Sequence, residues 1–104
     1  MIVITGTVVV DEADREAFLA LAETQVTNSR EEEGCLGYRC GEDTMQRGVF
    51  TFIERWRDQA AVDEHFAKDY CRKFIAEAAK LARNEVAIEL IHADRVDVRK
   101  VPSA

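Results

Sequence analysis

Two titratable side chains within apolar stretches are the first candidates for acid–base chemistry. Glu54 alternates with aromatic side chains in the run FTFIERW of residues 50–56, and His65 lies between Val62 and Phe66. A carboxyl group that is buried without a partner has a raised pKa, and a histidine titrates near neutral pH. Either group is therefore a candidate acid or base, and His65 has the pKa needed to remove the proton of a phenol or quinol.

Both candidates also have a structural interpretation, which the sequence leaves open. Glu54 could form an ion pair with Arg39 or Arg57, because a carboxylate is costly to bury without a charged partner. His65 could be a hydrogen-bonded residue of the core, since it occupies an apolar helix stripe.

Several aromatic and amide side chains could bind a flat substrate. Phe52 and Trp56 share the strand face of Glu54, because alternate residues of a strand point to the same side. Trp56 could form an aromatic wall or belong to the core, and Tyr38 could bond a substrate carbonyl or be a half-buried sheet residue. Asn28 has the same two interpretations near a helix end. The predicted substrate-binding residues are Trp56, Phe52, Tyr38, Asn28 and Phe74.

No segment of the sequence carries a motif for a metal or an organic cofactor. The two histidines, His65 and His92, have no ligand partners at metal-site spacing, and the five glycines form no phosphate-binding loop. Flavin and nicotinamide motifs are absent as well. We therefore expect a site without a cofactor, and we expect His92 on the last predicted strand to be structural or interfacial.

Charge and cysteine content restrict the partners and the compartment. A net charge of −6 without a Lys/Arg cluster argues against binding to nucleic acid or an anionic membrane surface. The longest apolar run, within residues 2–10, is too short to cross a bilayer and has no basic leader. The three cysteines are an odd number without C-x-x-C spacing, which predicts reduced thiols. We therefore expect a cytoplasmic protein.

The periodicity of the chain predicts strands and helices in the order βαββαβ within one domain, residues 1–104. Asp11 and Asp58 are the predicted N-caps of the helical regions, and Asn84 is the predicted end of the second one. On the second strand, Leu36, Tyr38 and Cys40 are expected to share one face, with Cys35 on the other. The predicted strands cover residues 2–10, 35–42, 49–56 and 86–98, and the helices cover residues 11–32, 58–68 and 69–84.

This order predicts an α+β fold in which one antiparallel sheet carries helices on one face. The first strand is apolar on both sides, with Ile2 and Ile4 on one and Val3 and Val9 on the other. The helices cover only one side, and a chain of 104 residues has too little remaining sequence to cover the second. We therefore expect a homodimer in which a second copy covers the free face.

Two motifs resemble the antibiotic-biosynthesis-monooxygenase family. The run NSREEEGCLGY of residues 28–38 is similar to the family's passage from a helix end into the second strand. Phe52-x-Glu54-x-Trp56, followed by an acidic helix cap and then His65-Phe66, is similar to its passage from the third strand into the second helical region. The resemblance covers about residues 2–94.

The resemblance implies a ferredoxin-like fold that assembles into a dimeric α+β barrel, with a pocket between sheet and helices in each subunit. Members of the family include cofactor-independent monooxygenases of quinols and anthrone-like aromatics, haem-degrading enzymes, and isomerases of small sugar-derived signals. The haem-degrading pattern needs a later helical histidine where this chain has Phe74 and Ile75, and a first-strand asparagine where it has Thr5 and Gly6. This disfavours haem as a substrate.

Three hypotheses for the function follow. The first is a cofactor-independent monooxygenase of a small aromatic or quinol-like molecule, with molecular oxygen as co-substrate and His65 or Glu54 as the catalytic acid or base. The second is an isomerase of a small oxygenated metabolite that uses the same base without oxygen. The third is a ligand-binding or structural dimer without turnover.

Overall fold

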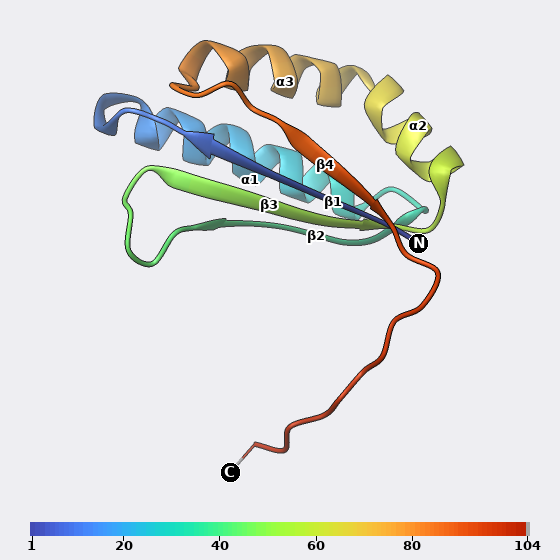
Figure 1. Ribbon diagram of the computed structural model, residues 1–104. Helices are drawn as coiled ribbons and strands as arrows, with labels where there is room; N and C mark the ends of the chain where they lie inside the picture. Colours follow the sequence, from blue (N-terminus) through green and yellow to red (C-terminus); the bar gives the residue numbers. More distant parts are fainter. Residues whose placement is uncertain (104) are drawn as a thin grey trace.

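The computed structural model describes residues 1–103, and its centre is one antiparallel sheet (Figure 1). The sheet consists of β1 (Ile2–Val9), β2 (Cys35–Glu42), β3 (Val49–Trp56) and β4 (Ile88–His92), in the spatial order β2-β3-β1-β4. Because β1 lies between β3 and β4, its apolar side chains are central to the core. This strand order confirms the predicted ferredoxin-like α+β fold.

Three α-helices within residues 1–103 cover one face of the sheet (Figure 1). Their inward residues pack on the alternate strand positions that face them, among them Ile4, Phe50 and Trp56, which are at most 1% exposed. Burial of these large apolar side chains is the main term that holds the layers together. The helices are α1 (Arg15–Arg30), which follows the short 3₁₀ helix η1 (Glu12–Asp14), α2 (Gln59–Ala67) and α3 (Asp69–Leu81).

The boundary between β3 and α2 follows the sequence signals. The Asp58 carboxylate accepts a hydrogen bond from the Ala61 amide at 2.9 Å, which caps the start of α2 as predicted. Lys68 has extended backbone angles (φ −65°, ψ 137°) and separates α2 from α3, so the predicted break is confirmed. This break allows α3 to turn and run across the sheet, where it forms one wall of a cavity.

The helical segment starts directly after Asp11, as predicted, and the ends of α1 and α3 lie two and three residues before their predicted positions. The Asp11 side chain makes no capping hydrogen bond and forms an ion pair with Arg83 at 3.2 Å, and the regular helix α1 begins only at Arg15 and ends at Arg30. Helix α3 ends at Leu81, three residues before Asn84. The Asn84 side chain forms hydrogen bonds with the backbone of Val9 and Thr7 at the end of β1 and lies outside the helix.

The extent of β4 and the faces of β2 also differ from the prediction. Strand β4 covers only Ile88–His92 of the predicted 86–98, because it ends where its partner β1 ends, at the Ile2–His92 pair. A bulge at the start of β2 places Cys35 opposite Trp56, on the core side, and leaves Leu36 51% exposed. Cys35 therefore lies on the same face as Tyr38, in contrast to the predicted alternation.

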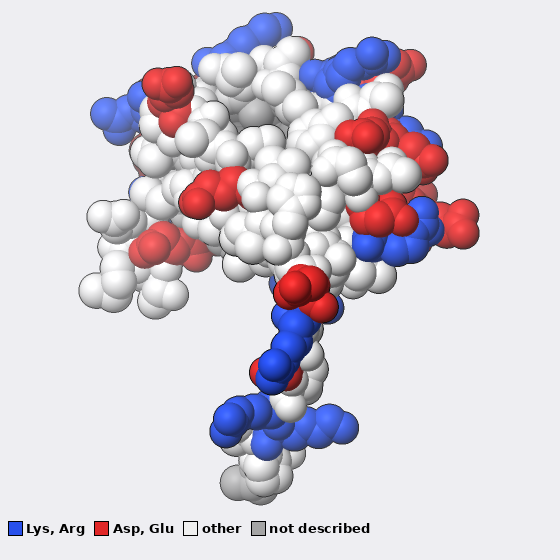
Figure 2. All heavy atoms as spheres, turned by 45° about the vertical axis from the view of Figure 1, so that its right-hand side comes forward, with Lys and Arg blue, Asp and Glu red and all other residues white. Residues whose placement is uncertain are grey.

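The second face of the sheet has no helix over it, and the last residues extend away from the body (Figure 1). Ile53 and Ile91 on this face are 49% and 48% exposed. Residues 93–103 have no regular structure, and their basic side chains stand out on the projecting segment in Figure 2. The helix-free face thus leaves apolar surface uncovered in the single chain.

Candidate functional site

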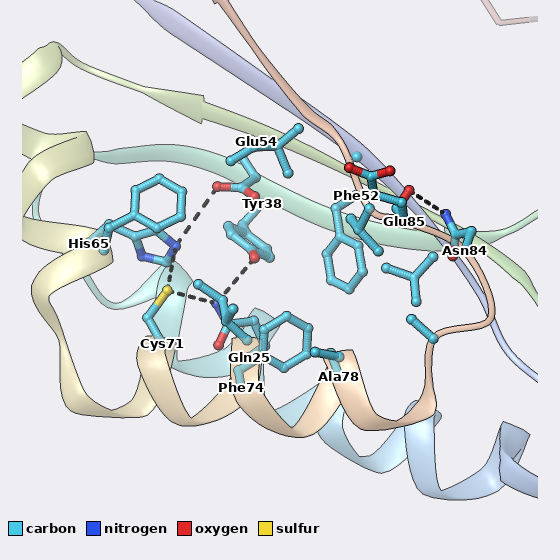
Figure 3. A pocket seen from close by; sticks show the side chains of 18 residues that line it. Gln25, Tyr38, Phe52, Glu54, His65, Cys71, Phe74, Ala78, Asn84 and Glu85 are labelled. Atoms are coloured by element: carbon cyan, nitrogen blue, oxygen red, sulfur yellow. Dashed lines mark hydrogen bonds and ion pairs between the residues drawn. The ribbon is translucent and has the colours of Figure 1, made fainter.

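A cavity of about 480 Å³ lies between the sheet and α3 (Figure 3). Its walls are mainly apolar, and the rings of Phe52 from β3 and Phe74 from α3 meet edge to face with centroids 5.6 Å apart. The volume is in the range that holds a small organic ligand. Polar side chains lie at both ends of the cavity: His65, Glu54, Tyr38 and Gln25 at one, Asn84 and Glu85 at the other.

Glu54 projects from β3 into the polar end of the cavity and is only 7% exposed. Burial raises the pKa of its carboxyl group to about 7, although the hydrogen bond from Trp56 Nε1 to Glu54 Oε1, at 2.9 Å, acts in the opposite direction. His65 Nε2 lies 3.9 Å from the same oxygen. Glu54 can therefore exist protonated or ionised near neutral pH.

His65 projects from α2 and is 1% exposed. Its Nδ1 lies 2.7 Å from Glu32 Oε2, and its ring stacks beside Trp56 with centroids 4.3 Å apart. Burial lowers the pKa of the imidazole, while the adjacent Glu32 carboxylate raises it. The imidazole is thus neutral over most of the physiological range, and its second nitrogen faces Glu54 and the cavity (Figure 3).

A second polar chain runs across the same end of the cavity. Gln25 Nε2 donates to the Tyr38 hydroxyl at 3.2 Å and lies 3.7 Å from Cys71 Sγ, which is in turn 3.5 Å from His65 Nε2. Burial raises the pKa of the Tyr38 hydroxyl and raises that of the Cys71 thiol to about 11, so both groups keep their protons at neutral pH. They can donate hydrogen bonds without carrying charge.

This arrangement can accept and return a proton inside an apolar space. A neutral imidazole and a carboxyl group with a pKa of about 7 lie side by side, so a proton can be held by either. An acidic hydroxyl group of a ligand placed beside this pair would contact a base from which water is excluded. The hydrogen bond between hydroxyl and base is stronger in such an apolar space than in water. The site therefore suits proton removal from a ligand that is itself apolar.

The structure places the predicted site residues in two groups. Trp56 is fully buried behind Glu54 and is not part of the cavity lining, and Asn28 lies outside the cavity on α1. The ion pairs considered for Glu54 do not form, since Arg57 bonds Asp58 and Arg39 is exposed. The functional roles predicted for Trp56 and Asn28 stay predictions. The residues that line the cavity are His65, Glu54, Phe52, Tyr38 and Phe74.

Sequence reasoning did not select four side chains of this network. Glu32 belongs to a run of three glutamates that looks like an exposed helix end, so no local pattern distinguishes it. Gln25 occupies the apolar stripe of α1, and a polar residue at such a position was the one available signal. Cys71 and Tyr70 start α3 and have no distinguishing spacing.

Metal and phosphate sites have no counterpart in this cavity. Among the residues that the structure describes, no three His, Cys, Asp or Glu side chains are grouped closely enough to hold a metal ion. The cavity lining contains neither Lys nor Arg, the side chains that bind phosphate groups. In residues 1–103, no helix combines the length and apolar character needed to cross a membrane.

Known proteins resemble the chain in sequence and in structure. A family model described as antibiotic biosynthesis monooxygenase matches residues 1–77. The uncharacterized protein sll1783 of Synechocystis sp. is 35% identical over 89 residues, which are 86% of this chain and 60% of that protein. The chain thus spans less than two thirds of that relative's length.

Two further comparisons are closer to the full length of their partners. The Bacillus subtilis protein named "Putative monooxygenase YcnE" is 33% identical over 81 residues, which are 78% of this chain and 85% of YcnE. A Deinococcus radiodurans crystal structure superposes with a TM-score of 0.88 at 24% identity, over 96% of this chain and 100% of that one. The last comparison shows a shared fold.

Proposed function

This chain belongs to the antibiotic biosynthesis monooxygenase family, and from that premise we propose that it is a cofactor-independent monooxygenase of a small, neutral phenol or quinol. The observation that carries the proposal is the apolar cavity of about 480 Å³ that ends in the Glu54–His65 pair. Such a cavity can hold a flat aromatic ring against the Phe52 and Phe74 side chains, with its hydroxyl group directed at a base.

The charges around the cavity support a neutral substrate. Its lining includes the carboxyl groups of Glu54 and Glu85 but no Lys or Arg, so an anionic carboxylate or phosphate would enter without a partner. A small neutral aromatic satisfies the cavity better than a phosphorylated sugar or the propionate groups of haem. This charge distribution argues against anionic ligands of either enzyme class, and oxygen uptake separates oxygenation of a phenol from isomerisation of a neutral, small oxygenated metabolite.

The reaction needs a base and oxygen, and the chain supplies the base. The Glu54–His65 pair removes the hydroxyl proton, and the electron-rich anion transfers one electron to O₂. The resulting radical and superoxide combine to form a carbon–oxygen bond, and the peroxide anion takes back the proton held by the Glu54–His65 pair, which gives a ring hydroperoxide. Loss of the ring C–H proton and cleavage of the O–O bond then release water and leave a quinone, so that one oxygen atom enters the product.

The tested substrate is a neutral naphthol-type phenol with a free carbon opposite its hydroxyl group. We expect the wild-type protein to consume one O₂ per quinone formed, and both Glu54→Gln and His65→Phe to lower kcat by about 10²-fold or more. Glu64→Gln, an exposed carboxyl on α2, is the matched control and is expected to keep full activity. Binding of the phenol without oxygen uptake would support a ligand-binding protein and contradict the proposal.

The same proposal includes a homodimer formed through the helix-free face of the sheet. The exposed Ile53 and Ile91 support it, since apolar sheet surface of this kind is normally covered. We expect sedimentation of the wild type as a dimer, a shift toward monomer in Ile53→Glu, and no shift in Met45→Glu, whose side chain is 88% exposed in the β2–β3 turn. A monomeric wild type would contradict the dimer.

We also infer a cytoplasmic location. Cys35, Cys40 and Cys71 are free thiols, as expected of a protein in a reducing compartment. Formation of a disulfide or mixed disulfide in the protein isolated under thiol-blocking conditions would contradict this inference.

A further inference from the structure

The His65 imidazole is held on its far side by a carboxylate that follows α1. Glu32 Oε2 lies 2.7 Å from His65 Nδ1, and the Glu32 side chain is only 10% exposed. The Tyr70 hydroxyl, from the start of α3, donates a hydrogen bond to the same carboxylate oxygen and lies 3.3 Å from Ser29 Oγ. The Tyr70 hydroxyl therefore helps to fix the position of the Glu32 oxygen beside the imidazole.

This contact determines which nitrogen of the neutral imidazole carries the proton. A carboxylate oxygen accepts hydrogen bonds, so the 2.7 Å contact favours the tautomer in which Nδ1 carries the proton. The lone pair of the imidazole is then on Nε2, which lies 3.9 Å from Glu54 Oε1 and 3.5 Å from Cys71 Sγ at the polar end of the cavity. A histidine ring held by a carboxylate on one nitrogen can act as a base through the other.

We propose that Glu32 is a positioning residue, which holds His65 in the Nδ1–H tautomer so that Nε2 faces the cavity as a proton acceptor. The inference rests on the proposed oxygenase function for its kinetic consequence, but the tautomer itself is a property of the free protein. Without the carboxylate, the ring could place its proton on Nε2, and the cavity would then meet a donor where catalysis needs an acceptor.

The groups that face His65 come from β2, β3, α3 and the segment after α1. In addition to Glu32, Tyr70 and Cys71 lie on the α3 side, while Glu54 lies on β3 and Tyr38 on β2, with ring centroids of Tyr38 and His65 5.8 Å apart. Glu32 is the member of this group whose oxygen contacts Nδ1 at 2.7 Å. Its replacement should therefore change the tautomer more than replacement of any other.

The direct test is ¹⁵N NMR of the full chain labelled at histidine, at pH 8 and without ligand. The chain has two histidines, so the exposed His92 provides an internal reference for His65. We expect wild-type His65 to show a protonated Nδ1 and an unprotonated Nε2, and Glu32→Gln to shift the population toward the Nε2–H form, because the glutamine amide can donate to Nδ1. A wild-type His65 in the Nε2–H form would overturn the proposal.

Kinetics with the matched control Glu33→Gln separate positioning from a general loss of structure. Glu33 is an exposed neighbour on the same segment. We expect Glu32→Gln to lower kcat roughly 10- to 100-fold with KM changed less than about twofold, and Glu33→Gln to leave both unchanged. An unchanged tautomer and kcat in Glu32→Gln would overturn the proposal. If the wild type oxidises no phenol, the oxygenase function fails, while the wild-type spectrum still decides the role of Glu32.

Discussion

Replacement of Glu54 by Gln should stabilise the protein, and only at high pH. Burial raises the pKa of Glu54 from its ordinary value of 4.5 to about 7 in the folded protein. The unfolded chain therefore loses this proton near pH 4.5 and the folded protein near pH 7, so folding becomes less favourable as pH rises between these values. Above pH 7 the folded protein carries the full cost of burying the ionised carboxylate. The pKa difference of about 2.5 units between the folded and unfolded states corresponds to about 3 kcal/mol of lost stability.

Glu54→Gln removes this penalty and keeps an oxygen that can accept the Trp56 Nε1 hydrogen bond. The free energy of unfolding, measured with urea at fixed protein concentration, should rise by roughly 2 to 3 kcal/mol more at pH 8.5 than at pH 5, relative to wild type. Glu64→Gln, on the exposed side of α2, should show no such pH-dependent gain. A gain that is the same at both pH values, or a loss at pH 8.5, would refute the assignment of a buried carboxyl with a raised pKa at Glu54.

Two further substitutions test the surroundings of the cavity. Trp56→Phe removes the Nε1–H donor that stabilises ionised Glu54, so the pKa of Glu54 should rise. The acidic limb of the pH profile of kcat/KM should then move up by about one pH unit. An unmoved limb would show that Glu54 does not control this limb. Gly34→Ala places a methyl group 2.4 Å from Ala61 Cβ and should reduce the free energy of unfolding by about 1 to 3 kcal/mol in urea titrations. Gly41→Ala, whose added methyl group would have no atom within 4 Å, should cause no such reduction. Equal effects of the two substitutions would argue against tight packing between Gly34 and Ala61.

The fold was predictable because periodicity in this chain is local and consistent. The alternation of residues 49–56 and the two apolar sides of β1 are direct consequences of strand geometry, and both appear in the structure. The ends of elements were less predictable, because they depend on partners. Strand β4 ends where β1 ends, and the Asn84 side chain bonds the Val9 amide and the Thr7 carbonyl instead of closing α3.

The candidate site was predictable where its residues interrupt a local periodic pattern. Glu54 and His65 are polar residues inside apolar patterns, and such exceptions are visible in a sequence. Glu32 is polar among polar residues, and its contact with His65 joins positions 33 residues apart. Only the packing of α1 against α3, and of α3 against α2, brings that carboxylate to the imidazole, so no local pattern could identify it.

The most direct test of the central claim is the fate of ¹⁸O₂ in the reaction with a neutral naphthol-type phenol. If the Glu54–His65 pair deprotonates a phenol for oxygenation, the quinone formed by the wild type should carry one ¹⁸O atom, with the second atom in water. Glu54→Gln should form this labelled product about 10²-fold more slowly or not at all. Unlabelled quinone with hydrogen peroxide as the oxygen product, or equal labelling rates in wild type and Glu54→Gln, would contradict the account.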